Sequence, residues 1–348
     1  MKRSAGVRAG WPSAVSARAG GGTPPSRPAK TPAVLAFATV CIVWGTTYLF
    51  IRIAVETIPP LLLTAARYLG AGVILLAIAA ARGDRIPRDR RLLREIAVVG
   101  VLLVGVGNLS VVWAEQWVPS GIAALLVATA PFWATLFEAL RSGGERVQRL
   151  RLAGMLLGFT GVALLVTPGG AGGAFDRRFV LGAIAIQIGC VGWQYGTSRG
   201  KYNLAAVPPL MSSALQALAG GAIVGVAGLA LGELPRFHVT TRTLVALLYL
   251  MIFGSVIAFT AYIVAMRTLR VTTLSLYSYV NPVVAVILGW IVLNERLTWV
   301  SITAMAIILA GVALVRGGSV FRGAAARRGS IEEPTLRGRV ALEEGEQH

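Results

Sequence analysis

The reactive residue types in this sequence are too few and too scattered to form a catalytic centre. The chain has two histidines, His238 and His348, and two cysteines, Cys41 and Cys190. Both cysteines lie in apolar stretches, and the spacing of cysteine and histidine does not match that of a zinc site. We therefore predict no catalytic residues, no metal site and no cofactor, and we do not expect an enzyme.

Charged residues within apolar stretches are more informative, and the two candidates are Arg67 and Glu138. A charged side chain at the centre of a membrane helix costs about 2.5–3.5 kcal/mol. Arg67 could bind a carboxylate or phosphate through two parallel hydrogen bonds, or it could bond helix-end carbonyls or extend outward. Glu138 lies near a helix end, which favours a structural role over a proton relay. We place Glu56 and Glu115 in outer loops, so no buried acid is predicted and the coupling ion stays open.

Polar and aromatic residues near the middle of apolar stretches are candidates for a substrate site, because solutes bind near the midplane in transporters built from inverted repeats. With Arg67, the predicted site residues are Trp44, Thr46, Thr47, Asn108, Gln187, Trp193, Gln194, Tyr279 and Asn281. Pro131 and Pro282 are predicted to kink their helices. Each prediction has a structural alternative: the threonines could bond back to their own helix, the tryptophans could serve packing, and Asn281 could repair the backbone beside Pro282.

The composition places these residues in a membrane. The chain has 348 residues, is 55% hydrophobic and only 14% charged, and has a mean hydropathy of +0.71. Ten apolar segments are each near the length that a helix needs to cross a bilayer. They are 33–53, 60–81, 92–113, 120–140, 150–167, 180–198, 208–231, 243–265, 272–293 and 297–316. The sequence therefore predicts an all-α polytopic membrane protein with ten transmembrane helices.

The distribution of lysine and arginine predicts the orientation. With the N-terminus inside, 26 of the 33 basic residues lie in inner segments and five in outer segments. Inner loops of membrane proteins carry this excess, so both termini are predicted to be cytoplasmic. The tails at 1–32 and 317–348 lack the apolar residues of a core and are predicted to be disordered. Because the net charge of +18 lies in tails and short loops, we predict no nucleic-acid partner.

The two halves of the chain are related by an internal repeat. A shift of 149 residues aligns Cys41 with Cys190, Trp44 with Trp193, and Arg52 with Lys201. Later positions align with a shift of 150 or 151, including Glu145–Arg146 with Glu295–Arg296. Each copy has five helices, an odd number, so the second copy enters the membrane from the opposite side. We predict inverted repeats at 33–167 and 180–316, joined by a linker at 168–179.

Two stretches carry a specific resemblance. They are "VWGTTYLFIRIAVETIPPLLLTAARYLGAG" near the start of the first repeat and "TLSLYSYVNPVVAVILGWIVLNERLTWVSITAMAIILAGVALV" at the end of the second. The chain resembles the drug/metabolite transporter superfamily, EamA type, over about residues 33–316. The resemblance implies ten helices and the export or exchange of a small metabolite.

The function predicted from the sequence is therefore secondary transport, with export as the expected direction, of a small metabolite such as an amino acid, by alternating access. The alternatives are a polytopic membrane enzyme and a membrane scaffold without transport activity. Short loops without clusters of histidine, aspartate or cysteine disfavour the enzyme, and short tails disfavour the scaffold. The expected partners are a small-molecule substrate and the lipid bilayer. The expected location is the inner membrane of a bacterium, and the sequence alone leaves the oligomeric state open.

Overall fold

The structure is a computed structural model that describes residues 30–140, 149–167, 175–274 and 277–314. Residues 1–29 of the predicted N-terminal tail, the predicted C-terminal tail, most of the linker, and Glu145 and Arg146 lie outside the described residues. The last three residues of the predicted N-terminal tail, 30–32, belong to the first helix instead. Every regular element within the described ranges is helical. In chain order the elements are α1 (Lys30–Ala54), α2 (Pro60–Ala81), α3 (Arg90–Gly100), η1 (Val101–Asn108), α4 (Leu109–Ala114), α5 (Ser120–Val127), α6 (Ala130–Leu140), α7 (Arg149–Leu165), α8 (Arg177–Asn203), α9 (Pro209–Ala230), η2 (Leu234–Arg236), α10 (Thr241–Tyr249), η3 (Leu250–Ile257), α11 (Ala258–Thr268), α12 (Val271–Leu274), α13 (Tyr277–Leu293) and a final helix, Trp299–Leu314.

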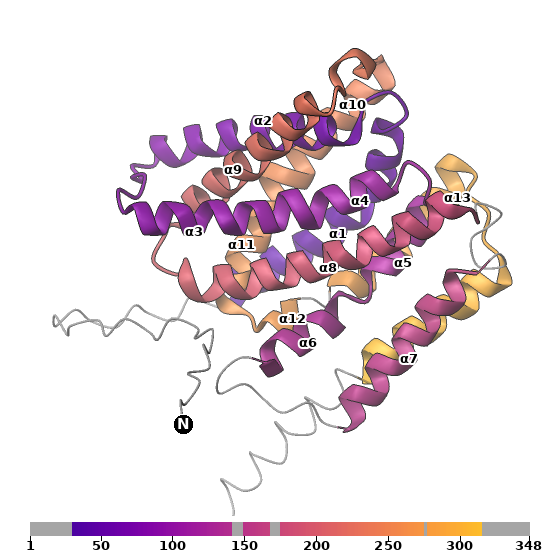
Figure 1. Cartoon of the computed structure of the whole chain (residues 1–348). Helices are drawn as coiled ribbons and strands as arrows, with labels where there is room; N and C mark the ends of the chain where they lie inside the picture. Colours follow the sequence, from indigo (N-terminus) through magenta and orange to yellow (C-terminus); the bar gives the residue numbers. More distant parts are fainter. Residues whose placement is uncertain (1–29, 141–148, 168–174, 275–276, 315–348) are drawn as a thin grey trace, which may run out of the picture.

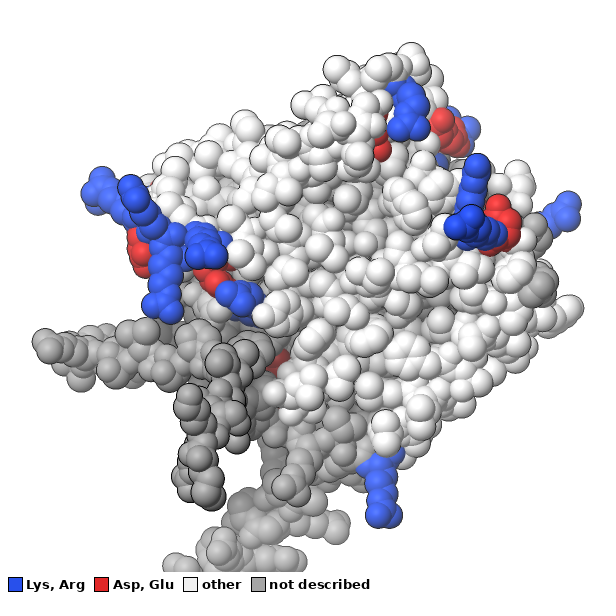
Figure 2. All heavy atoms as spheres, in the orientation of Figure 1, with Lys and Arg blue, Asp and Glu red and all other residues white. Residues whose placement is uncertain are grey.

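The helices account for all ten predicted membrane segments. Seven helices in the described ranges are long and apolar enough to cross a membrane, and three shorter apolar helices complete the set. The shorter ones are Leu152–Leu165, Val280–Leu293 and Trp299–Leu314. Figure 2 shows lysine and arginine gathered at opposite ends of the bundle, with a broad band of uncharged residues between them. This is the surface expected of a protein with a lipid-facing belt.

Equivalent helices of the two repeats pack against each other. In the pair formed by α2 and α9, Gly221 lies against Leu69 and Gly225 against Ala65. The helix α7 and the final helix lie side by side (Figure 1). In this pair Gly161 lies against Ile308. Small residues let helix backbones approach closely, which provides much of the packing energy inside a bilayer.

Two membrane helices contain π-helical turns, which the sequence analysis did not predict. They are η1, between α3 and α4, and η3, between α10 and α11. The first residues of η1 and η3, Val101 and Leu250, differ in number by 149, so the two turns occupy equivalent positions in the repeats. A π turn widens the helix and often marks a functional site. Both halves of the chain therefore interrupt regular helix geometry at the same depth.

The fourth membrane helix is broken rather than merely bent. It consists of α5 and α6, separated by a turn at Ala128 and Thr129. Pro131 is the second residue of α6, where its missing N–H cannot bond to the carbonyl of Val127 in α5. Pro282, in contrast, lies inside α13, which continues through it.

The two ends of the bundle are named here after the charge-based prediction. The outer end holds the turns at 55–59, 115–119 and 231–240, and the inner end holds the turns at 82–89, 204–208 and 269–270. Glu295 lies at the outer end, because its carboxylate accepts hydrogen bonds from the N-terminus of α5. The central part of the bundle between these ends holds the candidate site.

Candidate substrate site

A cavity of about 70 Å³ lies at the centre of the bundle, between helices of both repeats. About 10–15 Å³ of such volume holds one water molecule, so the cavity has room for a small polar solute. Seven of the ten predicted site residues line it: Trp44, Thr47, Arg67, Asn108, Trp193, Gln194 and Asn281. Tyr48 and Tyr277 also line it, although neither was among the predicted site residues.

Arg67 is the charged group of the cavity. Its side chain is 1% exposed, and its Nε donates a hydrogen bond to the hydroxyl oxygen of Ser255, 2.6 Å away. Ser255 belongs to η3, so the second repeat holds an arginine that comes from the first. The Nη1 atom of Arg67 is buried and has no hydrogen-bond partner within the described part of the chain. The Nε atom of the guanidinium is thus held by Ser255, while Nη1 is available to bind a ligand.

Two amides of the cavity also have buried polar atoms without partners among the described residues. These atoms are Oδ1 of Asn108 and both Nε2 and Oε1 of Gln194. Asn108 is the last residue of η1, and Gln194 lies near the middle of α8. Most buried polar groups in proteins are paired, because leaving one unpaired costs about 1–3 kcal/mol. The cavity therefore offers donors and acceptors that a polar ligand can satisfy.

Aromatic rings form part of the cavity wall, which Trp44, Trp193 and Tyr277 line. The Trp44 and Trp193 rings meet edge to face with 5.3 Å between their centroids, and Tyr262 and Tyr277 pack against Trp44. Trp44 Nε1 donates to the carbonyl oxygen of Gly254 at 3.1 Å, and Trp193 Nε1 donates to the Tyr262 hydroxyl at 2.8 Å. Each indole is therefore anchored by a hydrogen bond.

Three predicted residues are not among the lining residues. Thr46 donates to the carbonyl of Val43 and bonds the Tyr249 hydroxyl. Gln187 donates from Nε2 to the carbonyl of Leu126, at the break between α5 and α6, and so supports that break. The side chain of Tyr279 lies outside the described part of the structure. Thr47, which does line the cavity, also donates back to its own helix at Trp44.

Polar contacts join helices at the outer end of the bundle, both between the repeats and within the first repeat. The Glu295 carboxylate accepts hydrogen bonds from the backbone N–H groups of Ser120 and Gly121, at 2.7 and 3.1 Å. A carboxylate at a helix N-terminus is stabilised by the helix dipole and by unpaired N–H groups. Arg52, at the end of α1, donates to the main-chain carbonyl of Glu115 at the C-terminus of α4.

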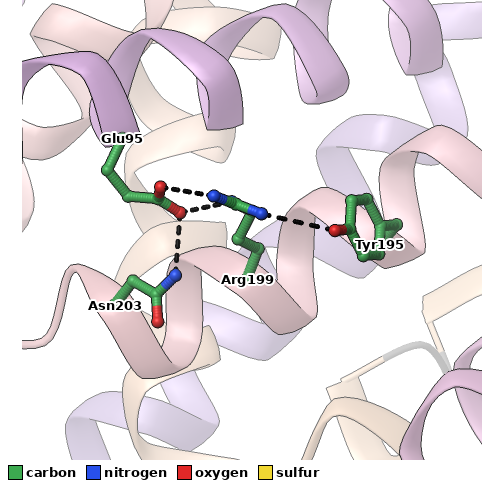
Figure 3. A network of polar contacts seen from close by, with 4 residues as sticks. All are labelled: Glu95, Tyr195, Arg199 and Asn203. Carbon is green, nitrogen blue, oxygen red and sulfur yellow. Dashed lines mark hydrogen bonds and ion pairs between the residues drawn. The ribbon is translucent and has the colours of Figure 1, made fainter. Parts of the chain in front are cut away.

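A network of polar side chains joins α3 and α8 at the inner end. Glu95 of α3 forms a bidentate ion pair with Arg199 of α8 and accepts a further hydrogen bond from Asn203 at 2.8 Å (Figure 3). Arg199 also donates to the Tyr195 hydroxyl at 3.3 Å (Figure 3). A bidentate arginine–carboxylate pair fixes geometry more strongly than a single contact, so α3 and α8 are held together here.

The two repeats make equivalent contacts through one basic residue each. Lys201, the repeat equivalent of Arg52, donates to the main-chain carbonyls of Met266 and Leu269 at the end of α11. Arg52 makes the same kind of contact at the outer end, with the carbonyl of Glu115. In each repeat a basic residue thus satisfies free carbonyls at a helix C-terminus, where a positive charge is favourable.

Comparison with known proteins decides the family. The model of the EamA-like transporter family matches twice, at residues 31–167 and 180–317. This chain belongs to the EamA-like transporter family. It is 38% identical, over 79% of its own length and 87% of the relative's, to a protein of Escherichia coli K12 named "Uncharacterized inner membrane transporter YedA".

More distant relatives of this EamA-like transporter align with it over a similar share of the chain. It is 27% identical to "Protein PecM" of Dickeya dadantii, over 82% of this chain and 92% of that protein. A solved crystal structure aligns with a TM-score of 0.61 and 27% identity, over 82% of this chain and 96% of the other. The relatives thus share nearly the whole membrane portion.

In this EamA-like transporter Glu115 lies in the outer turn at 115–119, as predicted, directly after the end of α4. The prediction that no acid is buried was wrong, because the bundle packs around this turn and the Glu115 side chain is 0% exposed. Ser255 was also missed, since a serine in an apolar stretch gives no sequence signal of its partner. Glu138 accepts hydrogen bonds from Ser198 and Tyr202 of α8, which supports the structural interpretation of that residue.

Proposed function

We propose that this EamA-like transporter exports a small zwitterionic metabolite, such as an amino acid, across the inner membrane of a bacterium. The observation that carries the proposal is the set of unpartnered, buried polar atoms around one central cavity: Nη1 of Arg67, Oδ1 of Asn108, and Nε2 and Oε1 of Gln194. The guanidinium suits a carboxylate, and the amide oxygens suit an ammonium group.

The aromatic side of the cavity supports the same class of substrate. Trp44 and Tyr277 line it, and the faces of such rings attract cations. A zwitterion would therefore place its ammonium group near the rings and amides, and its carboxylate at Arg67. A purely anionic solute would leave the acceptor oxygens of Asn108 and Gln194 unused.

Transport would proceed by alternating access between the two repeats, with both termini in the cytoplasm. Polar contacts between the repeats bridge both ends of the bundle: Glu295 with Ser120 at the outer end, and Arg199 with Glu95 at the inner end. Opening one end while the other stays closed requires breaking only one of these sets of contacts.

The test compares metabolites released by cells with and without the protein, followed by flux measurements on purified protein in liposomes. The liposomes would be loaded with the common L-amino acids, each carrying a radioactive label. We expect efflux of one or a few of them, and loss of that efflux in the Arg67→Gln variant. Efflux of no amino acid, together with release of another solute class by cells, would contradict the proposed substrate. Chemical turnover without flux would favour the alternative of a membrane enzyme.

A further inference from the structure

Glu115 is a buried carboxylate that no part of the proposed binding site uses. It follows the membrane-spanning helix Arg90–Ala114, and its side chain is 0% exposed. Neither carboxylate oxygen has a hydrogen-bond partner among the described residues. An ionised carboxylate in such a place is strongly disfavoured, because it has lost water and gained no hydrogen bond.

The groups that face Glu115 come from three directions. Arg52 of α1 and Arg67 of α2 bear positive charge, and Glu295, which follows α13, bears negative charge. Burial raises the pKa of Glu115 well above its usual range, Glu295 raises this pKa further, and the two arginines lower it. The hydroxyl of Tyr48 in α1 also lies within electrostatic reach of Glu115.

The fourth neighbour of this helix end brings no charge. α8 approaches α4 through Gly182, which lies against Ala114 and Val118. Phe179 and Ala183, on the same part of α8, are buried and apolar. The charged and titratable environment of Glu115 therefore comes from α1, α2 and Glu295.

The position of Glu115 connects the cavity with the outer end. Val111 lines the cavity, and Glu115 follows it by four residues, on the same face of the helix and about 5–6 Å further along. The cavity-lining Arg67 and Tyr48 are both within electrostatic reach. The hydrogen bond from Arg52 goes to the main-chain carbonyl of Glu115, so it holds the residue in place and leaves the carboxyl oxygens without a partner.

We propose that Glu115 is the proton-binding site of the transport cycle: its carboxyl group holds a proton while the outer end is closed and releases that proton to water when the outer end opens. This inference rests on the proposed transport function and adds a proton that controls the opening of the outer end. A proton fits better than a metal cation, since two guanidinium groups face the site. The described residues also contain no group of three histidine, cysteine, aspartate or glutamate side chains that could hold a metal.

The sign of the pH effect follows from the two conformations. Glu115 binds its proton more tightly when buried than when exposed to water at an open outer end. Acidification therefore favours the closed outer end, and alkalinisation favours its opening. The pH of the water at the outer end would then set the balance between the closed and the open outer end.

The first test is an infrared pH titration of the purified full-length protein, which needs no substrate. We expect a protonated-carboxyl band that titrates well above the ordinary glutamate value of about 4.3. The band should be absent in Glu115→Gln and present, with a changed midpoint, in Glu115→Asp. The matched control is Glu56→Gln, which removes an exposed outer acid paired with Arg242 and should leave the band unchanged. An unchanged band in Glu115→Gln would overturn the proposal, as would a titration that disappears when sodium ions are replaced by choline.

The second test measures efflux of the labelled L-amino acid mixture from proteoliposomes, with and without a pH gradient. We expect the gradient to change wild-type efflux at least severalfold and to have no effect on Glu115→Gln. Wild-type efflux that does not change with the gradient would overturn the proposal that Glu115 binds a proton, and it would leave the proposed transport function intact. Absence of efflux in every variant would instead contradict the proposed function, while the infrared titration would still decide whether Glu115 binds the proton.

Discussion

Arg67 of the first repeat donates a hydrogen bond from its Nε to the Ser255 hydroxyl of the second repeat, at 2.6 Å. This contact orients the guanidinium across the interface between the repeats and leaves Nη1 without a partner among the described residues. The binding group and its support therefore come from different halves of the chain, so a relative movement of the repeats would move the binding group as well.

Replacing Arg67 tests its role in binding. We expect Arg67→Gln, which installs the residue of the equivalent position, Gln216, to leave the protein folded and to remove most transport. Losing charge-assisted hydrogen bonds costs about 1.5–3 kcal/mol, or about a tenfold to hundredfold loss of affinity. Arg67→Lys should be intermediate, because it keeps the charge without the planar fork. Radiolabelled efflux from proteoliposomes measures the effect, and wild-type flux in a well-expressed Arg67→Gln variant would leave Arg67 as a structural anchor.

The π-helical glycines provide a matched pair of variants. A Cβ atom added at Gly254 would lie 2.8 Å from Nη2 of Arg67, so Gly254→Ala should displace the guanidinium and reduce transport severalfold or more. Its repeat equivalent, Gly105, has ordinary space, with the nearest atom 3.5 Å from the added Cβ. Gly105→Ala should therefore transport like the wild type. Equal transport by the two variants would contradict the close fit around Arg67.

The Glu95–Arg199 ion pair should hold the inner end closed. Neutralising it in Glu95→Gln removes a bidentate contact between α3 and α8, which favours conformations open to the inner side. A cysteine at Asn281, introduced after replacement of Cys41 and Cys190, reports access to the cavity by thiol labelling. We expect labelling from the inner side to increase severalfold in Glu95→Gln.

The control for this experiment is Glu56→Gln, because the Glu56–Arg242 pair is exposed and lies at the outer end. An exposed ion pair contributes about 0–1 kcal/mol, so its loss should leave inner labelling unchanged. Labelling at residue 281 that is the same from both sides in all variants, with or without substrate, would argue against alternating access.

The predicted orientation has a direct test. Reporter fusions after residue 173 and after residue 204 should lie on opposite sides of the membrane, with the second in the cytoplasm. The physical reason is that one membrane helix separates the two positions, and basic residues concentrate in the segments assigned to the inside. Reporters on the same side would contradict the inverted arrangement of the repeats.

Much of the architecture could be predicted from the sequence, since each of its determinants is local. Apolar runs of membrane length predict helices, because lipid offers the backbone no other hydrogen-bond partner. The repeat could be recognised from residues such as Trp44 and Trp193, and their equivalence needs no coordinates. Arg67, Asn108 and Gln194 could be selected because polar side chains are costly in the middle of apolar helices.

The tertiary structure decided which of these side chains meet. Gln187 and Asn108 look alike in the sequence, but Gln187 supports the break between α5 and α6 while Asn108 faces the cavity. The sequence does not predict that Glu115 is buried, because this burial depends on the packing of α2 and α8 against α4 and on the contact with Arg52 of α1. In the sequence Ser255 is an isolated serine within an apolar stretch. In the structure it lies in the π-helical turn η3, where its hydroxyl group accepts a hydrogen bond from Arg67. Helix formation is a property of short segments, whereas the partners named here lie 61 to 188 positions apart, and local patterns do not specify such contacts.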